Sequence, residues 1–168
     1  MMNLLETRKA ALIAGVAVLA ADQVSKVLVR SWLPRGSVVP VIEGFFNIVH
    51  VRNRGVAFSL LGDLPPSVIN PILLVITGGV FLFLLYILFR RDPLFHPRLS
   101  LGLVAGGAAG NILDRILHGD VTDFLDFYAG RYHWPAFNVA DAAITCGIIL
   151  ILLFTLLPNL RGEKRKLE

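Results

Sequence analysis

Two aspartates, Asp123 and Asp141, are the residues of this chain best suited to chemistry, because neither has a lysine or arginine within four residues to explain it as an ion pair. Two carboxylates a few ångströms apart cannot both ionise cheaply, so one pKa is expected to rise and the other to fall. The ionised partner can take a proton from water while the protonated one polarises an amide carbonyl. If the fold brings them together, the pair predicts hydrolysis without a covalent enzyme intermediate.

Competing hydrolytic machinery is missing from the sequence. It contains no H-E-x-x-H or G-x-S-x-G pattern and no G-x-G-D, and its four histidines are scattered. We therefore predict no metal site. The one cysteine, Cys146, excludes a disulfide within the chain, and its position in an apolar run predicts a small buried residue.

The composition indicates what kind of scaffold holds the two aspartates. Of 168 residues, 55% are hydrophobic and 17% charged, whereas about a quarter are charged in an ordinary soluble domain. Mean hydropathy is +0.70. The apolar residues lie in long blocks, so we expect one polytopic membrane domain over residues 1–168 and no binding of nucleic acid.

Four segments are long enough to cross a bilayer, which takes about 20 residues each. They are residues 10–29, 68–89, 99–117 and 138–157. The first has features of a cleaved signal peptide, but its apolar pattern resumes at once as VSKVLV and gives a full span. The expected fold is a membrane all-α bundle of four transmembrane helices.

Basic residues predict the orientation of the bundle, because cytoplasmic loops are rich in lysine and arginine. One side collects nine of them: Arg8, Lys9, Arg90, Arg91, Arg98, Arg161, Lys164, Arg165 and Lys166. The other side has five: Arg30, Arg35, Arg52, Arg54 and Arg131. Both termini are therefore expected in the cytoplasm, and Asp123 and Asp141 near the outer face.

The first outer loop, residues 30–66, is rich in β-branched and aromatic residues. FFNIVHV and GVAFSLL predict two short strands joined by a turn at RNRG, hence a small extracytoplasmic β-sheet. The alternative is an interfacial loop without a sheet. The second outer segment, between the third and fourth spans, is expected to be a loop or a helix.

Further polar residues interrupt the spans, where charged groups are costly and usually functional. Asp22 and Lys26 are four apart and share a helix face, either as part of the site or as a structural pair. Arg115 either serves the site or snorkels to headgroups. Asp141 and Asn138 are also compatible with a simple helix cap.

Asp120 and Asp126 lie close to Asp123 in the sequence but have a simpler interpretation. Both are expected to be solvated loop charges or partners of Arg131 at the interface.

These patterns together resemble the bacterial lipoprotein signal peptidases (signal peptidase II), over nearly the whole chain. The matching boxes are DQVSK at 22–26, NRGVAF at 53–58, GNILDR at 110–115, VTDF at 121–124 and FNVADAAI at 137–144. Each box is weak evidence alone. Their order on four predicted spans makes the resemblance specific.

The resemblance implies that Asp123 and Asp141 are the catalytic dyad of an intramembrane aspartyl endopeptidase. Supporting or substrate-binding roles are implied for Asn53, Gly55, Asn111, Arg115, Asn138, Asp22, Lys26 and Asp114. The implied reaction removes the signal peptide of diacylglyceryl-modified prolipoproteins before the lipidated cysteine. The family also implies a β-cradle above the membrane, no metal or organic cofactor, contact with membrane lipids, and binding of globomycin-type inhibitors. We expect a monomer in the bacterial inner membrane.

Two other functions are compatible with buried membrane carboxylates. A transporter or proton relay would spread its carboxylates through the depth of the bundle, whereas here they gather toward the outer side. A non-catalytic scaffold would tolerate asparagine at positions 123 and 141.

Overall fold

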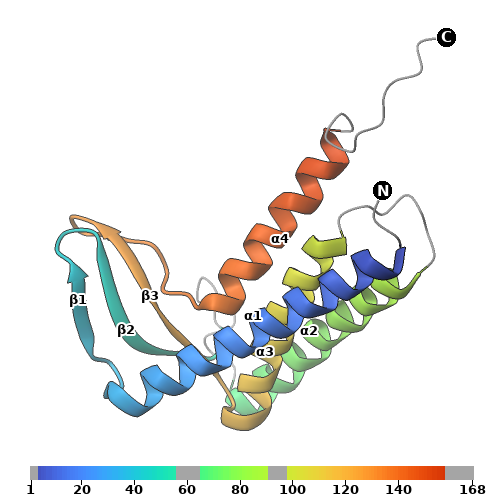
Figure 1. Ribbon diagram of the computed structural model, residues 1–168. Helices are drawn as coiled ribbons and strands as arrows, with labels where there is room; N and C mark the ends of the chain where they lie inside the picture. The colour runs from blue at the N-terminus through green and yellow to red at the C-terminus, as the bar shows by residue number, and fades with distance from the viewer. Residues whose placement is uncertain (1–3, 56–64, 91–97, 158–168) are drawn as a thin grey trace.

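The computed structural model describes residues 4–55, 65–90 and 98–157 as four helices and four strands. The helices are α1 (Leu4–Trp32), α2 (Pro66–Phe89), α3 (Arg98–His118) and α4 (Val139–Leu156). The strands are β1 (Val38–Ile42), β2 (Phe46–Asn53), β3 (Val121–Ala129) and β4 (Tyr132–His133). Figure 1 shows the sheet at one end of the helices, away from the N-terminus.

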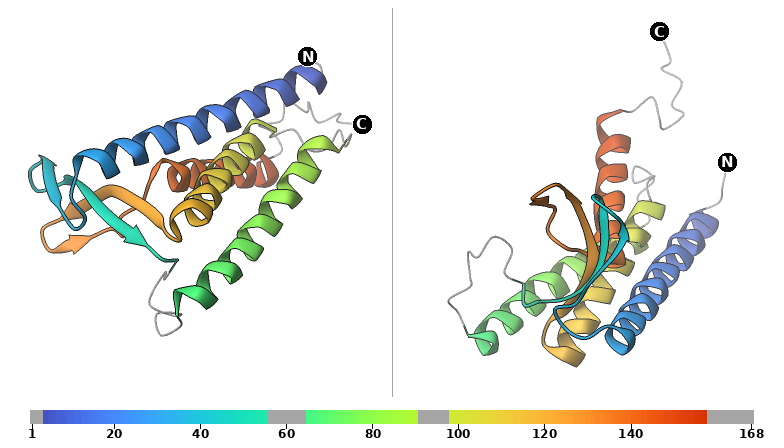
Figure 2. Two further views of the ribbon diagram at one scale, coloured as in Figure 1. Left: turned by 90° about the horizontal axis from the view of Figure 1, so that it is seen from below. Right: turned by 90° about the vertical axis from the view of Figure 1, so that its left-hand side faces the viewer.

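All four predicted spans are helical, but only three of the described helices are long and apolar enough to cross a membrane. They are Leu5–Trp32, Ser67–Phe89 and Val139–Leu156. The four-span bundle is thus supported for three helices. Helix α3 differs because it is the central helix, packed against α1, α2 and α4, and Figure 2 shows it between α1 and α2. Its glycines and polar residues lower its hydropathy where it contacts protein.

Glycines on α3 allow the neighbouring backbones to approach closely. A Cβ on Gly102 would overlap the backbone of Ala11, and one on Gly106 would overlap that of Gly15 on α1. A Cβ on Gly107 would overlap the carbonyl of Ala140 on α4. Small residues at helix crossings are the usual basis of association in membranes. The close contacts fix the position of the outer end of α3, which carries several polar residues.

The sheet is antiparallel with the order β1-β2-β3-β4. The predicted small sheet is confirmed, since FFNIVHV largely forms β2. The predicted turn at RNRG is wrong at its start: Arg52 and Asn53 still belong to β2 and pair with Thr122 and Val121. Most of the predicted strand GVAFSLL lies outside the described residues.

β2 pairs with β1 on one side, and its other partner comes from the segment between α3 and α4, which we expected to be a loop or helix. That segment forms β3, and its register sets Val51 opposite Asp123. VTDFLDFYA contains valine, threonine, phenylalanine and tyrosine, which are enriched in strands. The strand also contains aspartates, which are depleted in most strands, and this made it hard to predict from sequence.

Helix α4 turns an apolar surface outward, and this corrects the expectation for Cys146. The thiol is exposed, as are Ile148 and Ile149 nearby. A membrane helix can be as apolar toward lipid as toward protein, so an apolar run does not predict burial against protein.

Basic residues of three helices meet at the end of the bundle opposite the sheet. Arg8 on α1 donates to the carbonyl oxygens of Phe89 and Arg90 at 2.7 and 3.0 Å. Arg98 at the start of α3 donates to Leu88 at 3.1 Å. These contacts agree with the predicted grouping of Arg8, Arg90 and Arg98 on one side.

Candidate active site

Asp123 lies on β3 with its carboxylate held by two asparagines. Asn138 donates from Nδ2 to Oδ1 of Asp123 at 2.7 Å. Asn53, at the end of β2, donates to Oδ2 at 2.9 Å. Asp123 is 2% exposed, so its two oxygens face protein amides in a largely dry place.

Asp141 is positioned by the first turn of α4. Asn138 caps this helix: its side-chain oxygen accepts from the amide of Asp141 at 3.0 Å, and its own amide donates to Oδ2 of Asp141 at 3.3 Å. This reciprocal capping box satisfies two free donors at the helix start. Asn111 on α3 donates to the other oxygen, Oδ1, at 2.8 Å. The expected helix-cap role is therefore real, and Asp141 also belongs to a larger polar cluster.

Asn138 and Asn111 connect the two aspartates. Asn138 contacts both Asp123 and Asp141, and its Nδ2 also lies 3.3 Å from Oδ1 of Asn111. The pKa of Asp123 is raised to about 6, because burial and the negative charge of Asp141 raise it more than the hydrogen bonds from Asn53 and Asn138 lower it. The expected interaction between two carboxylates is therefore present at Asp123.

Gly55 holds the turn that follows Asn53. Its amide donates to the side-chain oxygen of Asn53 at 2.8 Å, and its φ of +86° lies in the left-handed region that favours glycine. The turn leaves Nδ2 of Asn53 directed at Asp123.

A buried ionic network supports this cluster from α1. Lys26 is fully buried and lies 2.8 Å from Asp22 and 3.2 Å from Asp114. Its Nζ also donates to Oδ1 of Asn111 at 3.0 Å. Lys26 therefore fixes Asn111, which in turn holds Asp141.

The two aspartates of this network attach it to other elements. Asp22 accepts a hydrogen bond from the amide of Ala140 on α4 at 2.9 Å. Asp114 accepts from the amide of Thr122 on β3 at 3.1 Å and pairs with Arg30 at 3.2 Å. Asp22 and Lys26 are thus a structural pair, one of the two interpretations offered by the sequence, and they also orient the cluster.

Arg115 is half-buried beside the aspartates. Its only hydrogen bond to described residues runs from Nη1 to the carbonyl of Asn111 at 3.4 Å, and its buried Nε has no partner there. The carboxylates of Asp141 and Asp123 are close enough to attract its positive charge. This position favours a role in the site over snorkelling.

Asp120 and Asp126 are not solvated loop charges, and neither pairs with Arg131. Both are buried. Asp120 forms an ion pair with Arg52. Asp126 accepts from Asn47 at 2.8 Å and lies 2.9 Å from Nδ1 of His133. These hydrogen bonds outweigh burial and lower the pKa of Asp126.

The correction follows from the sheet: Asp126 lies on β3 and Asp120 directly precedes it, so both lie beside partners on other strands. Arg30, Gln23 and Thr122 were also missed. Gln23 and Thr122 lie inside the boxes DQVSK and VTDF, and that position was the signal that could have indicated them.

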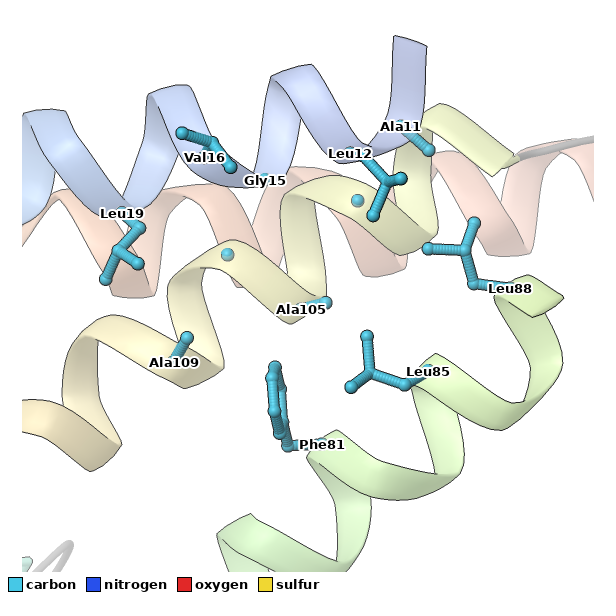
Figure 3. A pocket seen from close by; sticks show the side chains of 12 residues that line it. Ala11, Leu12, Gly15, Val16, Leu19, Phe81, Leu85, Leu88, Ala105 and Ala109 are labelled. Atoms are coloured by element: carbon cyan, nitrogen blue, oxygen red, sulfur yellow. The ribbon is translucent and has the colours of Figure 1, made fainter. Parts of the chain in front are cut away.

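Two cavities differ sharply in chemistry. One of about 580 Å³ opens beside Asp123 and is also lined by Asn53, Arg54, Pro135 and Ala136. Another, of about 150 Å³, lies between α1, α2 and α3 and is lined by Leu, Ala, Val, Gly and Phe side chains alone (Figure 3). Of these two, the first offers groups that can bind a peptide. Within the described ranges, no group of three histidines, cysteines or acids is placed to hold a metal ion.

Comparison with known proteins places these features in a known group. Residues 14–157 match the family described as Signal peptidase (SPase) II. A lipoprotein signal peptidase of Desulforapulum autotrophicum is 43% identical over 88% of this chain and 94% of its own. One from Syntrophus aciditrophicus is 42% identical over 92% and 94%. A solved bacterial membrane enzyme superposes with a TM-score of 0.75 at 30% identity, covering 93% of this chain and 92% of that one.

Proposed function

Since the chain belongs to the signal peptidase II family and is a membrane enzyme of that kind, we propose that it removes signal peptides from prolipoproteins through Asp123 and Asp141. The substrate is a diacylglyceryl-modified prolipoprotein, and cleavage falls just before the lipidated cysteine. The observation that carries the proposal is that Asn138 forms hydrogen bonds with both aspartates.

The proposed reaction uses one proton shared by the two carboxylates. The ionised carboxylate removes a proton from water, whose oxygen attacks the scissile carbonyl, while the protonated carboxyl donates its proton to the carbonyl oxygen. As the tetrahedral intermediate collapses and the C–N bond breaks, the carboxyl that gained the water proton passes it to the leaving amine. A hydroxyl of the intermediate returns a proton to the other carboxylate as the new carboxyl group forms. The raised pKa of Asp123, about 6, supports this scheme, because burial lets this carboxyl keep its proton to a higher pH than an ordinary aspartate does.

The surrounding amides are proposed to orient the pair and the peptide. Asn53 and Asn138 each donate to Asp123, and Asn111 donates to Asp141, so both carboxylates are held in defined orientations. Arg115 has guanidinium nitrogens that form no hydrogen bond with a described residue. It is available for a peptide carbonyl of the substrate, which otherwise lacks partners in a site with little water.

Substrate access is proposed through the cavity of about 580 Å³ beside Asp123. The acyl chains of a lipidated cysteine stay in the bilayer, so the scissile bond must lie near the membrane surface. A dyad at the junction of the sheet and the helices has that position if the sheet lies outside the inner membrane and both termini lie in the cytoplasm. Cyclic peptides of the globomycin type are expected to occupy the same cavity, with the enzyme acting as a monomer.

The test uses purified protein in lipid vesicles with a diacylglyceryl-modified prolipoprotein. Asp123→Asn and Asp141→Asn should each reduce cleavage at least about a hundredfold, the lower range for loss of a general acid or base. Asp126→Asn is the matched control on the same strand and should keep most activity. Cleavage that survives both dyad substitutions would exclude this mechanism.

A transporter or proton relay is the alternative from another class. It needs ionisable groups through the depth of the bundle. The described part of α2 carries no charged residue, and the one charge of α4, Asp141, lies in its first turn. The arrangement therefore favours hydrolysis.

A further inference from the structure

A second polar cavity, of about 120 Å³, lies where the ends of α1 and α3 meet β2 and β3. Its lining residues are Arg30, Arg35, His50, Arg52, His118, Asp120 and Thr122. We call it the arginine cavity. Neither Asp123 nor Asp141 lines it. We propose that the arginine cavity binds a phosphate group, and that this phosphate belongs to a phospholipid headgroup.

Charge in the arginine cavity favours an anion, since three arginines and two histidines accompany one aspartate. Arg52 pairs with Asp120 through Nε, and its Nη2 donates to the carbonyl of His118 at 2.8 Å. Arg30 engages Asp114 and Thr122 through Nη1 alone, at 3.2 and 3.1 Å. Both guanidinium groups therefore keep nitrogens without a partner among the described residues.

Arg35 adds a positive charge that no described residue neutralises. Its side chain has no hydrogen bond or ion pair with any residue in the described part of the chain. Arginine presents a planar fork of donors that matches phosphate oxygens. Arg35 is exposed and lines the cavity, so its guanidinium is available to bind an anion from solution.

His50 contributes a ring nitrogen that forms no hydrogen bond with a described residue. The residue is 4% exposed, and its Nδ1 lies 2.8 Å from the carbonyl oxygen of Leu33. A carbonyl only accepts, so Nδ1 carries the hydrogen. Nε2 has no partner among the described residues and is not among their buried unbonded atoms, so it is open to solvent in a residue that lines the cavity. A ligand in the cavity can therefore contact it.

The location favours a lipid as the source of the phosphate. Arg30 and His118 lie in the last turns of α1 and α3, and α1 is one of the three apolar spans found among the described helices. Trp32 at the end of α1 is 79% exposed, and tryptophan is enriched at the level of the headgroups. The arginine cavity therefore opens at the depth where phospholipid phosphates lie. This inference depends on membrane insertion but not on the proposed peptidase mechanism.

The experiment titrates the full-length protein in neutral detergent with phosphatidylglycerol or with diacylglycerol, which lacks the phosphate, and follows binding by native mass spectrometry. Arg35→Gln and His118→Gln test the cavity through two exposed side chains, so the fold should persist. Arg131→Gln is the matched control, because this arginine lies at the sheet end but outside the cavity. Inorganic phosphate serves as the competitor in a parallel arm.

We expect one phosphatidylglycerol to bind in preference to diacylglycerol, with affinity falling about tenfold in Arg35→Gln, the value of one charge-assisted hydrogen bond. Arg131→Gln should change it less than about twofold. Equal binding of the two lipids, or an equal loss in Arg131→Gln, would overturn the phosphate site. Binding of inorganic phosphate without any preferred lipid would keep the phosphate site and overturn its assignment to a headgroup.

Discussion

Nδ2 of Asn138 lies 2.7 Å from Oδ1 of Asp123, and this hydrogen bond joins the cap of α4 directly to strand β3. The same side chain caps the amide of Asp141 through its oxygen. One asparagine thus sets the positions of both aspartates, although it has no acid–base chemistry of its own.

Replacing Asn138 should therefore affect both activity and stability. Asn138→Ala removes the helix cap, which costs about 0.5–2 kcal/mol, and it frees one oxygen of Asp123. We expect a lower melting temperature. We also expect kcat to fall by a larger factor than KM changes. Asn138→Ser, which restores the cap alone, should recover stability but not the cleavage rate. Full recovery of both by serine would contradict the link to Asp123.

Cleavage should decline as the pH rises above about 6. Burial raises the pKa of Asp123 to about 6, and the proposed dyad needs one proton to act. Asn53 donates to the ionised form of Asp123 and so lowers this pKa. In Asn53→Ala the alkaline limb of the rate profile should move to higher pH. An unchanged or downward shift would contradict this account.

The same group gives a pH dependence of stability with a defined sign. Between about pH 4 and pH 6, Asp123 keeps its proton in the folded state while the unfolded chain has lost it. The folded state then binds more protons, so stability falls as the pH rises through this window, by at most about 3 kcal/mol. Asp123→Asn should flatten that part of the unfolding curve, measured by thermal denaturation in detergent.

Lys26 should be among the least replaceable residues of α1. Lys26→Met leaves the carboxylates of Asp22 and Asp114 buried without their shared cation, and breaking such a pair costs about 3–5 kcal/mol. Thermal unfolding of purified protein measures the loss. Lys9→Met, on the same helix at an exposed position, should change stability little. Equal effects of the two would rule out the network as the cause.

Two glycines offer a matched test of helix packing. A Cβ on Gly106 would overlap the backbone of Gly15, so Gly106→Ala should separate α1 from α3 and cost about 1–3 kcal/mol. A Cβ on Gly78 of α2 would meet no described neighbour within 4 Å. Gly78→Ala should be neutral or stabilising, because alanine is the better helix former. Equal unfolding temperatures for the two variants would contradict the packing role of Gly106.

The helices and the Asp22–Lys26 pair could be predicted from sequence, because each depends on local spacing. Asp22 and Lys26 are four residues apart on one helix, and the apolar blocks mark the helices directly. The strand β3 could not be predicted in the same way. Its partner β2 lies about 70 residues earlier in the chain, and the pairing depends on a register that only the whole fold sets.

The roles of Asp120 and Asp126 were missed for the same reason. Asn47, which holds Asp126, and Arg52, which pairs with Asp120, are distant in sequence and become neighbours only across the sheet. The polar character of α3 likewise depends on its neighbours. A helix enclosed by three others can carry glycines and charges that a lipid-facing helix cannot.

The cap at Asn138 has a consequence for the newly made chain. Synthesis proceeds from the N-terminus, and α4, which follows Asn138, is the last described helix to be made. Until it inserts, Asp123 lacks its bond from Asn138, and Asp22 lacks the amide of Ala140 that lies 118 residues further along the chain. A partly translated chain therefore holds one aspartate without the other. Proteolytic activity should therefore first appear only after α4 has been made and inserted.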